Sequence, residues 1–128
     1  MYTNLVVKSD FSFTEGASKI KDLVSKAKSL GHKSIALTDR NNMFGAYDFS
    51  KIAKAAGIQP IIGCQIPILY NKEENKSGYL TFLAQTEKGY ENLCYIMCES
   101  QKPNSDKTNP FSLDIKALMA FLEDIIIL

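Results

Sequence analysis

Residues 35–46 read IALTDRNNMFGA, and the predicted fold is organised around this segment. An apolar run leads directly into the polar residues 39–42, and a stretch that predicts a helix follows. In α/β folds the loops at the carboxyl ends of strands form the ligand face. We therefore expect a strand, a functional rim and a helix in this order, with Asp39 and Arg40 on the rim.

The same alternation of strand and helix continues along the chain. Short apolar runs predict strands at 5–7, 33–38, 60–70 and 79–84, and helical spacing predicts helices ending at Gly31, over 43–56 and over 89–99. Residues 100–110 predict a surface loop, and Ser112 and Asp114 are expected N-caps of a short helix through Phe121. Near-continuous apolar strands separated by helices are typical of a mostly parallel sheet with covering helices. The fold class is therefore α/β, and the short connection at 71–77 allows one antiparallel hairpin.

The first helix has a predicted start signal. Residues 12–15 match the capping box Ser-x-x-Glu, in which the hydroxyl and the carboxylate bond free backbone N–H groups. Apolar residues then recur at helical spacing up to Gly31, which predicts the end of the helix. We expect a helix that begins at this box, and the box accounts for Glu15.

Composition limits the possible functions. The 128 residues are ordinary for one globular domain, at 45% hydrophobic and 23% charged. A net charge of +1 gives no global electrostatic case for nucleic-acid binding. The chain has no signal-peptide pattern and no long apolar run, so we expect a cytoplasmic protein without a membrane partner. Three cysteines in that compartment do not predict disulfides, and Cys94 and Cys98 are expected on a shared buried helix face rather than at a metal.

The carboxyl terminus ends on an apolar segment. Residues 124–128 read DIIIL, which places four large aliphatic residues at the end of the chain. An exposed apolar strand is an unfavourable way to finish a domain. We therefore expect one domain over 1–128 that is truncated at its C-terminal end, as a further strand begins.

Few residues at the predicted strand ends are suited to catalysis or metal binding. These positions are Asn4, Val6, Lys8, Asp10, Glu15, Asp39, Arg40, Asn41, Gln65 and Tyr79. A metallohydrolase needs several converging His or carboxylate ligands, and only three carboxylates qualify here. The sole histidine, His32, lies at the opposite end of its strand, and no glycine-rich phosphate loop is present. Asp39 is a rim ion pair or anion contact, or, as we favour, a carboxylate that caps the next helix at Asn41 or Asn42.

Several blocks together resemble a known family. They are residues 8–17, 36–46, 57–64, 83–84 and 89–93. These blocks resemble the amino-terminal PHP (polymerase and histidinol phosphatase) domain of bacterial DNA polymerase III alpha subunits, and the match covers essentially the whole chain. The resemblance implies part of a distorted (β/α)7 barrel, similar to a TIM barrel, whose metal-dependent members hold ions at the carboxyl rim.

The metal pattern of that family is degenerate in this sequence. The family positions for metal ligands correspond here to Val6, Lys8, Glu15, Arg40, Gln65 and Tyr79. Only Glu15 keeps an acidic residue, and Lys8 and Arg40 bring positive charges that repel a divalent ion. The resemblance therefore implies no metal, no cofactor and no catalytic residue in this fragment. We expect Lys8, Arg40 and Glu15 to form a salt-bridged cluster in place of the metal.

The resemblance also implies a function for the longer protein. The parent chain is expected to be a DNA-directed DNA polymerase of DNA replication, a nucleotidyltransferase whose Mg²⁺ belongs to a palm domain beyond residue 128. The fragment itself is expected to be inactive alone and to dock subunits. Its expected partners are the rest of the alpha chain, the proofreading exonuclease subunit, and DNA only through the full-length protein. The alternatives are a metal-dependent PHP phosphoesterase or proofreading nuclease, and an unrelated α/β module for a small ligand.

Overall fold

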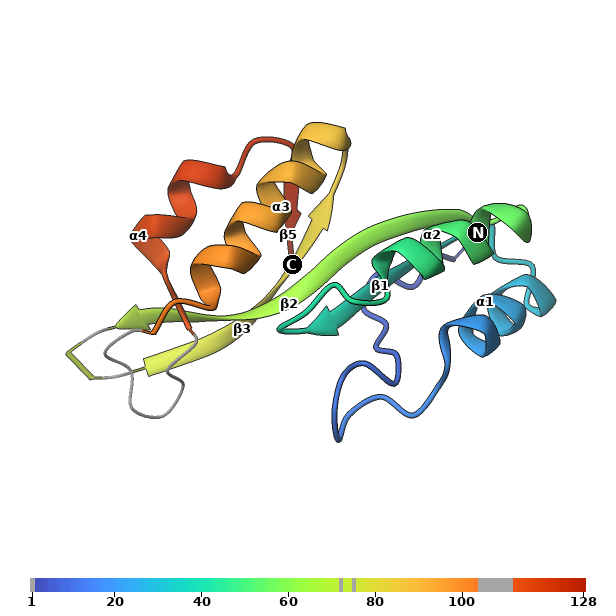
Figure 1. The fold of residues 1–128 in the computed structure, drawn as a ribbon, viewed down its shortest axis with the longest axis horizontal. Coiled ribbons are helices and arrows are strands. Elements are labelled where there is room, and N and C mark those ends of the chain that lie inside the picture. The colour runs from blue at the N-terminus through green and yellow to red at the C-terminus, as the bar shows by residue number, and fades with distance from the viewer. Residues whose placement is uncertain (1, 72, 75, 104–111) are drawn as a thin grey trace. The chain divides into compact units, whose positions relative to one another are not determined.

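The computed structural model describes residues 2–71, 73–74, 76–103 and 112–128. They form two compact units, unit 1 over Met1–Cys64 and unit 2 over Gln65–Leu128, and each is treated by itself. The elements are α1 Ile20–Ser29, β1 Ser34–Arg40, α2 Ala46–Ala55, β2 Gln59–Asn71, β3 Lys76–Ala84, α3 Glu87–Ser100, β4 Leu113–Asp114, α4 Ile115–Leu118, the 3₁₀ helix η1 Met119–Phe121, and β5 Ile125–Ile127 (Figure 1). Hydrogen-bonded strands follow the order β1-β2-β3-β5, and β4 pairs with β2.

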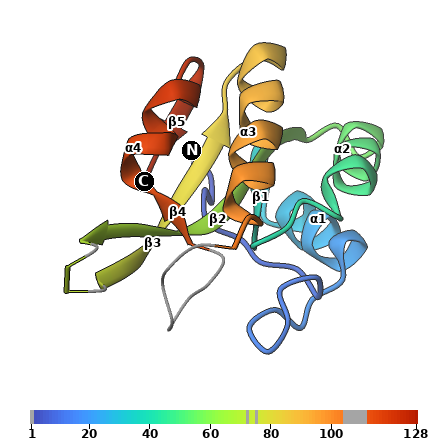
Figure 2. The ribbon, with the colours of Figure 1, turned by 60° about the vertical axis from the view of Figure 1, so that its left-hand side comes forward.

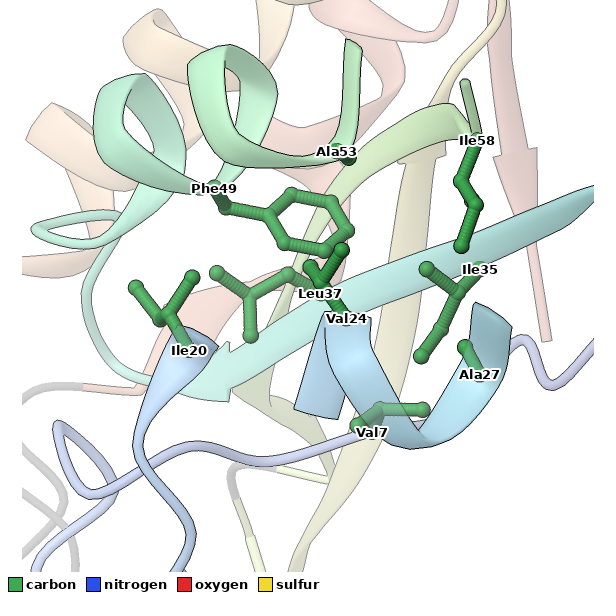
Figure 3. Close-up of a cluster of buried hydrophobic side chains, with 9 residues drawn as sticks. All are labelled: Val7, Ile20, Val24, Ala27, Ile35, Leu37, Phe49, Ala53 and Ile58. Atoms are coloured by element: carbon green, nitrogen blue, oxygen red, sulfur yellow. The ribbon is translucent and has the colours of Figure 1, made fainter. Parts of the chain in front are cut away.

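Unit 1 packs α1 and α2 around an apolar cluster that includes β1. Its buried members are Val7, Ile20, Val24, Ala27, Ile35, Leu37, Phe49, Ala53 and Ile58 (Figure 3). In α1 the inward residues recur every three to four positions, so one face of the helix is apolar. Gly31 and Gly57 end the two helices with φ of +73° and +75°, a conformation that favours glycine. The predicted stop at Gly31 is confirmed, and α2 ends within the predicted range 43–56.

Unit 2 packs α3 against its strands (Figure 2). β3 returns alongside β2 in the opposite direction, as expected for a hairpin (Figure 1). β5 pairs antiparallel with β3, with Leu83 opposite Ile126, and β4 runs parallel to β2. The buried face of α3 carries Leu93 and Ile96, as its spacing predicts. Within the described residues no helix is long and apolar enough to cross a membrane.

Most of the predicted elements are confirmed, with shifted ends. β2, β3 and α3 each include the segment predicted for them. β1 begins at Ser34 rather than at residue 33 and continues to Arg40, and α2 begins at Ala46 rather than at residue 43. Asp114 caps α4, because its carboxylate accepts a hydrogen bond from the Lys116 N–H at 2.9 Å. Most of the predicted loop at 100–110 lies outside the described residues. The α/β fold class is confirmed, although the sheet contains both parallel and antiparallel pairs.

The predicted capping box is wrong. α1 begins at Ile20, and its N-cap Lys19 makes no side-chain capping bond. Residues 12–16 form a turn in which the Glu15 and Gly16 N–H groups donate to the Ser12 carbonyl. The Ser12 hydroxyl donates instead to a buried carboxylate, and such a charge-assisted bond outweighs a local cap. The backbone at Gly16 also approaches Ser9 so closely that a Cβ would lie 1.8 Å from the Ser9 carbonyl oxygen.

Two smaller predictions also need correction. Residues 5–7 are not a regular strand: Asn4 makes one parallel bridge to Ile35, and the Val7 N–H donates to the Thr38 hydroxyl rather than to a backbone carbonyl. Cys94 and Cys98 do not share a buried face, because Cys94 is half-buried and Cys98 is exposed. The helix places these positions along the edge of its apolar face, whose centre is Leu93 and Ile96.

Phe49→Ala tests the unit 1 core. Phe49 is fully buried and points from α2 into the cluster (Figure 3), so the substitution leaves a cavity. We expect a loss of about 3–5 kcal/mol in the free energy of unfolding, measured by urea denaturation with circular dichroism. Phe13→Ala is the matched control, since Phe13 is exposed, and it is expected to change stability by less than about 0.5 kcal/mol. Equal effects of the two substitutions would contradict the packing.

Candidate functional site

The candidate site lies in unit 1, where the end of β1 meets residues 7–15. Thr38, Asp39 and Arg40 are consecutive, and all three bond to this N-terminal segment. The Thr38 backbone N–H donates to the Val7 carbonyl at 2.8 Å, and its hydroxyl exchanges two further bonds with the Val7 backbone. Thr38 therefore holds the N-terminal segment beside β1, where a regular strand ladder is missing.

Asp39 is the buried centre of this site. Its side chain is at the carboxyl end of β1 and the residue is 1% exposed. Oδ1 accepts from the Ser9 backbone N–H at 2.7 Å and from the Ser12 hydroxyl at 2.6 Å, and Oδ2 accepts from the Ser9 hydroxyl at 2.7 Å. A buried carboxylate is stable only when such donors replace its water. Asp39 therefore fastens residues 9–12 to the end of the strand.

The favoured prediction for Asp39, that it caps the following helix, is wrong. The N-cap of α2 is Gly45, and no side chain caps that helix. Asn42 shapes the loop instead: its Oδ1 accepts from the Phe44 N–H, and its amide donates to the Phe11 and Arg40 carbonyls. The roles of Ser9 and Asn42 were not predicted from the sequence. Both are short polar residues beside the predicted rim, and serine and asparagine readily bond nearby backbone groups, so this placement was the signal that could have predicted their roles.

The expected cluster of Lys8, Glu15 and Arg40 is present. Glu15 Oε2 is paired with Lys8 Nζ, and Glu15 Oε1 with Arg40 Nη1. All three side chains are partly buried, with exposed fractions between 20% and 28%. Each carboxylate oxygen thus has its own cation, so that Glu15 ties the start of the segment to the end of β1. The pairing is confirmed, and its relation to a metal remains a prediction.

The ion pairs and the buried carboxylate belong to one network. Among the described residues, Glu15 pairs with the two cations Lys8 and Arg40, and Asp39 is a second carboxylate at the end of β1. The Ser12 hydroxyl joins the two parts, since it donates to Asp39 and accepts from the Arg40 backbone N–H at 3.0 Å. These fixed cations supply the charge that one divalent ion would bring to two carboxylates. This set of side chains does not fit a divalent ion, because Lys8 and Arg40 offer it positive charge instead of lone pairs.

Three other predicted site residues are Val6, Gln65 and Tyr79. Val6 is half-exposed in unit 1, while Gln65 and Tyr79 belong to unit 2. The Gln65 amide lies 3.4 Å from the Thr81 hydroxyl. Asp10 is exposed, and His32 follows Gly31 at the start of β1 with its ring edge against Tyr2. In the described part of the chain, no three His, Cys, Asp or Glu side chains form a group suited to a metal.

Two neighbouring groups of α3, Tyr90 and Cys94, have shifted pKa values. Burial raises the pKa of the Cys94 thiol, and a hydrogen bond from Tyr90 opposes that rise. Burial also raises the pKa of Tyr90, and Cys94 adds to the effect. Both groups therefore stay neutral at physiological pH. A raised pKa disfavours the thiolate, so Cys94 is not an activated nucleophile.

The fold and the rim define the class of this protein. The PHP domain family matches residues 4–128, which is nearly the whole chain. The chain therefore belongs to the PHP domain family. Two solved structures, each 17% identical to this chain, support the same fold. One is a putative metal-dependent phosphoesterase from Bifidobacterium adolescentis, with a TM-score of 0.59 over 83% of this chain and 35% of the phosphoesterase. The other is an amidohydrolase from Chromobacterium violaceum, with a TM-score of 0.61 over 78% of this chain and 34% of the amidohydrolase.

Relatives with higher identity share one name, DNA polymerase III subunit alpha. The Helicobacter pylori (strain 26695) protein is 41% identical over 100 residues, the Treponema pallidum protein 42% over 103, and the Bacillus subtilis protein 37% over 109. These alignments cover 74%, 74% and 85% of this chain, and 8%, 9% and 10% of the relatives. The chain thus spans about a tenth of the length of these relatives.

Asp39→Asn tests the buried carboxylate. The substitution keeps the shape but removes the charge and one acceptor, while the donors of Ser9 and Ser12 remain. Because bonds to a charged group each contribute about 1.5–3 kcal/mol, we expect a loss of about 2 kcal/mol in the free energy of unfolding in urea. Asp48→Asn, at an exposed position of α2, is the control and should change it by less than about 0.5 kcal/mol. A neutral Asp39→Asn would mean that the charge has no structural role.

Proposed function

We propose that this chain is the amino-terminal PHP portion of a DNA polymerase III alpha subunit. The observation that carries the proposal is the identity of 37–42% to proteins of that name, over 74–85% of the chain. The full-length protein would be a DNA-directed DNA polymerase acting in replication. Its nucleotidyl transfer and its Mg²⁺ would belong to other parts of the longer polypeptide, and DNA would be bound only through that polypeptide.

We further propose that the PHP portion works without a metal or a catalytic residue of its own. The support is the chemistry of the rim, where Lys8 and Arg40 neutralise Glu15 at positions that hold metal ligands in the resembling family. At a separation of about 4 Å, the Coulomb repulsion between a partly buried cation and a divalent ion is of the order of several kcal/mol. The ion-paired network would then stabilise the rim in the way a bound ion does in other members.

The alternative is a metal-dependent phosphoesterase or a proofreading nuclease. One of the structures with this fold is named as a putative metal-dependent phosphoesterase. At 17% identity that likeness concerns the fold, and the reaction would still need ligands that bind metal. In this chain, Val6, Lys8 and Arg40 occupy three of the expected ligand positions with groups that offer no lone pair.

Metal analysis separates these two functions. The purified chain is dialysed against Zn²⁺, Mn²⁺ or Fe²⁺ and then freed of loosely bound ions. Its metal content is measured by plasma mass spectrometry, and its activity is measured as hydrolysis of bis-p-nitrophenyl phosphate. We expect metal far below one ion per chain and no hydrolysis, because the fixed cations exclude the ion. The B. adolescentis protein, treated identically, serves as the comparison for the procedure. Stoichiometric metal accompanied by hydrolysis would replace our proposal with the phosphoesterase.

Immunoprecipitation tests the polymerase assignment. Antiserum against residues 1–128 is applied to an extract of cells that express the protein. We expect a polypeptide about ten times larger than 14.3 kDa, since the relatives are about ten times longer, and extension of a primed template with nucleoside triphosphates and Mg²⁺. Preimmune serum is the control. A 14-kDa band without primer extension would remove the polymerase proposal.

The same precipitate tests the proposed partner. A docking role for this domain predicts that the proofreading exonuclease subunit is captured together with the polymerase. We expect 3′-to-5′ exonuclease activity in the precipitate, and its release when excess purified 1–128 chain competes for the subunit. Exonuclease activity that never co-precipitates, although primer extension does, would remove the partner and leave the polymerase assignment standing.

A further inference from the structure

Unit 1 carries an excess of positive charge. It contains nine lysine and arginine residues against five aspartate and glutamate residues, whereas unit 2 contains six against nine. The net charge of +1 for the whole chain therefore combines a positive unit with a negative one. Among the described residues, seven exposed lysines of unit 1 form no ion pair, and they are Lys19, Lys21, Lys26, Lys28, Lys33, Lys51 and Lys54.

Four of these lysines lie on α1 in two rows. Lys19 and Lys26 are seven residues apart, as are Lys21 and Lys28, and seven residues make almost two helical turns, or about 10 Å. One row lies about 100° to one side of Ile20 and the other lies about 100° to the other side. Ile20 points into the apolar cluster (Figure 3). The two rows therefore border the solvent-facing half of the helix.

Helix stability accounts for only half of these lysines. Lys26 and Lys28 lie in the last turn of α1, where positive charge interacts favourably with the helix dipole. Lys19 is the N-cap and Lys21 lies in the first turn, where the same dipole disfavours a cation. A residue that opposes local stability and has no compensating contact in the fold indicates a functional constraint. The lysines of the first turn therefore indicate a negatively charged ligand.

The surface between the two rows has no apolar anchor. Its side chains are those of Asp22, Ser25 and Ser29, which are exposed. Protein interfaces are enriched in aromatic side chains and arginine and depleted in lysine. A helix that binds a membrane needs an exposed apolar face, but the apolar face of α1 is buried in the unit 1 core. An acidic protein surface and a lipid surface therefore match this helix less well than a phosphate backbone does.

Double-stranded DNA matches the type and the density of these charges. Lysine is a flexible point charge without the fixed fork of arginine, and contacts with phosphate do not read the base sequence. The duplex carries one charge per about 1.7 Å of its axis, so the length of one lysine row spans about six phosphates. Binding of a single strand uses aromatic side chains on which bases stack, and no aromatic residue lies between the rows.

We propose that the solvent-facing side of α1 binds the phosphate backbone of double-stranded DNA through Lys19, Lys21, Lys26 and Lys28, without sequence preference. Four phosphate contacts give weak binding, with a Kd of about 10⁻⁴ M or weaker at physiological salt. The contact therefore matters when the longer polypeptide already holds the duplex. This inference rests on the proposed polymerase function and adds to it a surface through which the PHP portion contacts DNA.

The salt dependence of DNA binding tests this surface. The 128-residue chain is titrated into a fluorescein-labelled duplex of mixed sequence and about 20 base pairs, and anisotropy is measured between about 20 and 150 mM NaCl. We expect log Kd to rise by about 3.6 for a tenfold increase in salt, because each of four contacts releases about 0.9 counterion. The amides of residues 19–29 should shift in ¹⁵N–¹H correlation spectra when unlabelled duplex is added. Absence of these shifts would overturn the proposal.

Matched double variants separate this surface from the overall charge. Lys21→Gln with Lys28→Gln should lower the salt slope by about 1.8 and weaken binding at least about tenfold at the lowest salt. Lys88→Gln with Lys102→Gln removes the same charge from exposed positions of α3 and should leave the slope unchanged. Circular dichroism establishes that both variants are folded. Equal slopes of the two variants would contradict a site on α1.

Competing ligands test the choice of DNA. The duplex should bind more tightly than a single strand of the same length, polyglutamate of the same charge, or vesicles of anionic lipid. Equal or tighter binding of any of these three would overturn the proposal. Primer extension by the immunoprecipitated protein is measured separately. Primer extension without duplex binding by α1 removes only this inference, whereas duplex binding without primer extension removes the polymerase assignment.

Discussion

The rim of unit 1 depends on the buried carboxylate of Asp39. At 1% exposure this group has lost its water, and Ser9 and Ser12 supply the donors that replace it. The same bonds draw residues 9–12 onto the end of β1, although residues 5–7 form no regular strand ladder. The Asp39 side chain therefore attaches this segment to β1, whereas backbone hydrogen bonds join the strands elsewhere in the sheet. Phe11, Phe13 and Glu15 belong to or directly follow the attached segment, so their positions depend on this attachment.

The ion-paired network beside Asp39 is the second constraint on the rim. Glu15 pairs with Lys8 through one carboxylate oxygen and with Arg40 through the other, so that one side chain joins the N-terminal segment to the end of β1. Lys8 and Arg40 bring positive charge to the rim and offer no lone pair to a divalent ion. This chemistry is the basis of our proposal that the domain works without a metal.

The α/β class and most strands and helices could be predicted from the sequence alone, because apolar periodicity and glycine stops are local signals. The resemblance to the PHP family placed Lys8, Glu15 and Arg40 at one rim, and their opposite charges then predicted the ion pairs. The partners of Ser12 and Asp39 could not be predicted, because they depend on the folded arrangement: Ser12 bonds Asp39 instead of capping a helix, and Asp39 bonds backward to Ser9 instead of forward to α2. The bonding partners lie about thirty residues apart, and their choice depends on burial, because a desolvated carboxylate takes precedence over a solvent-exposed helix end.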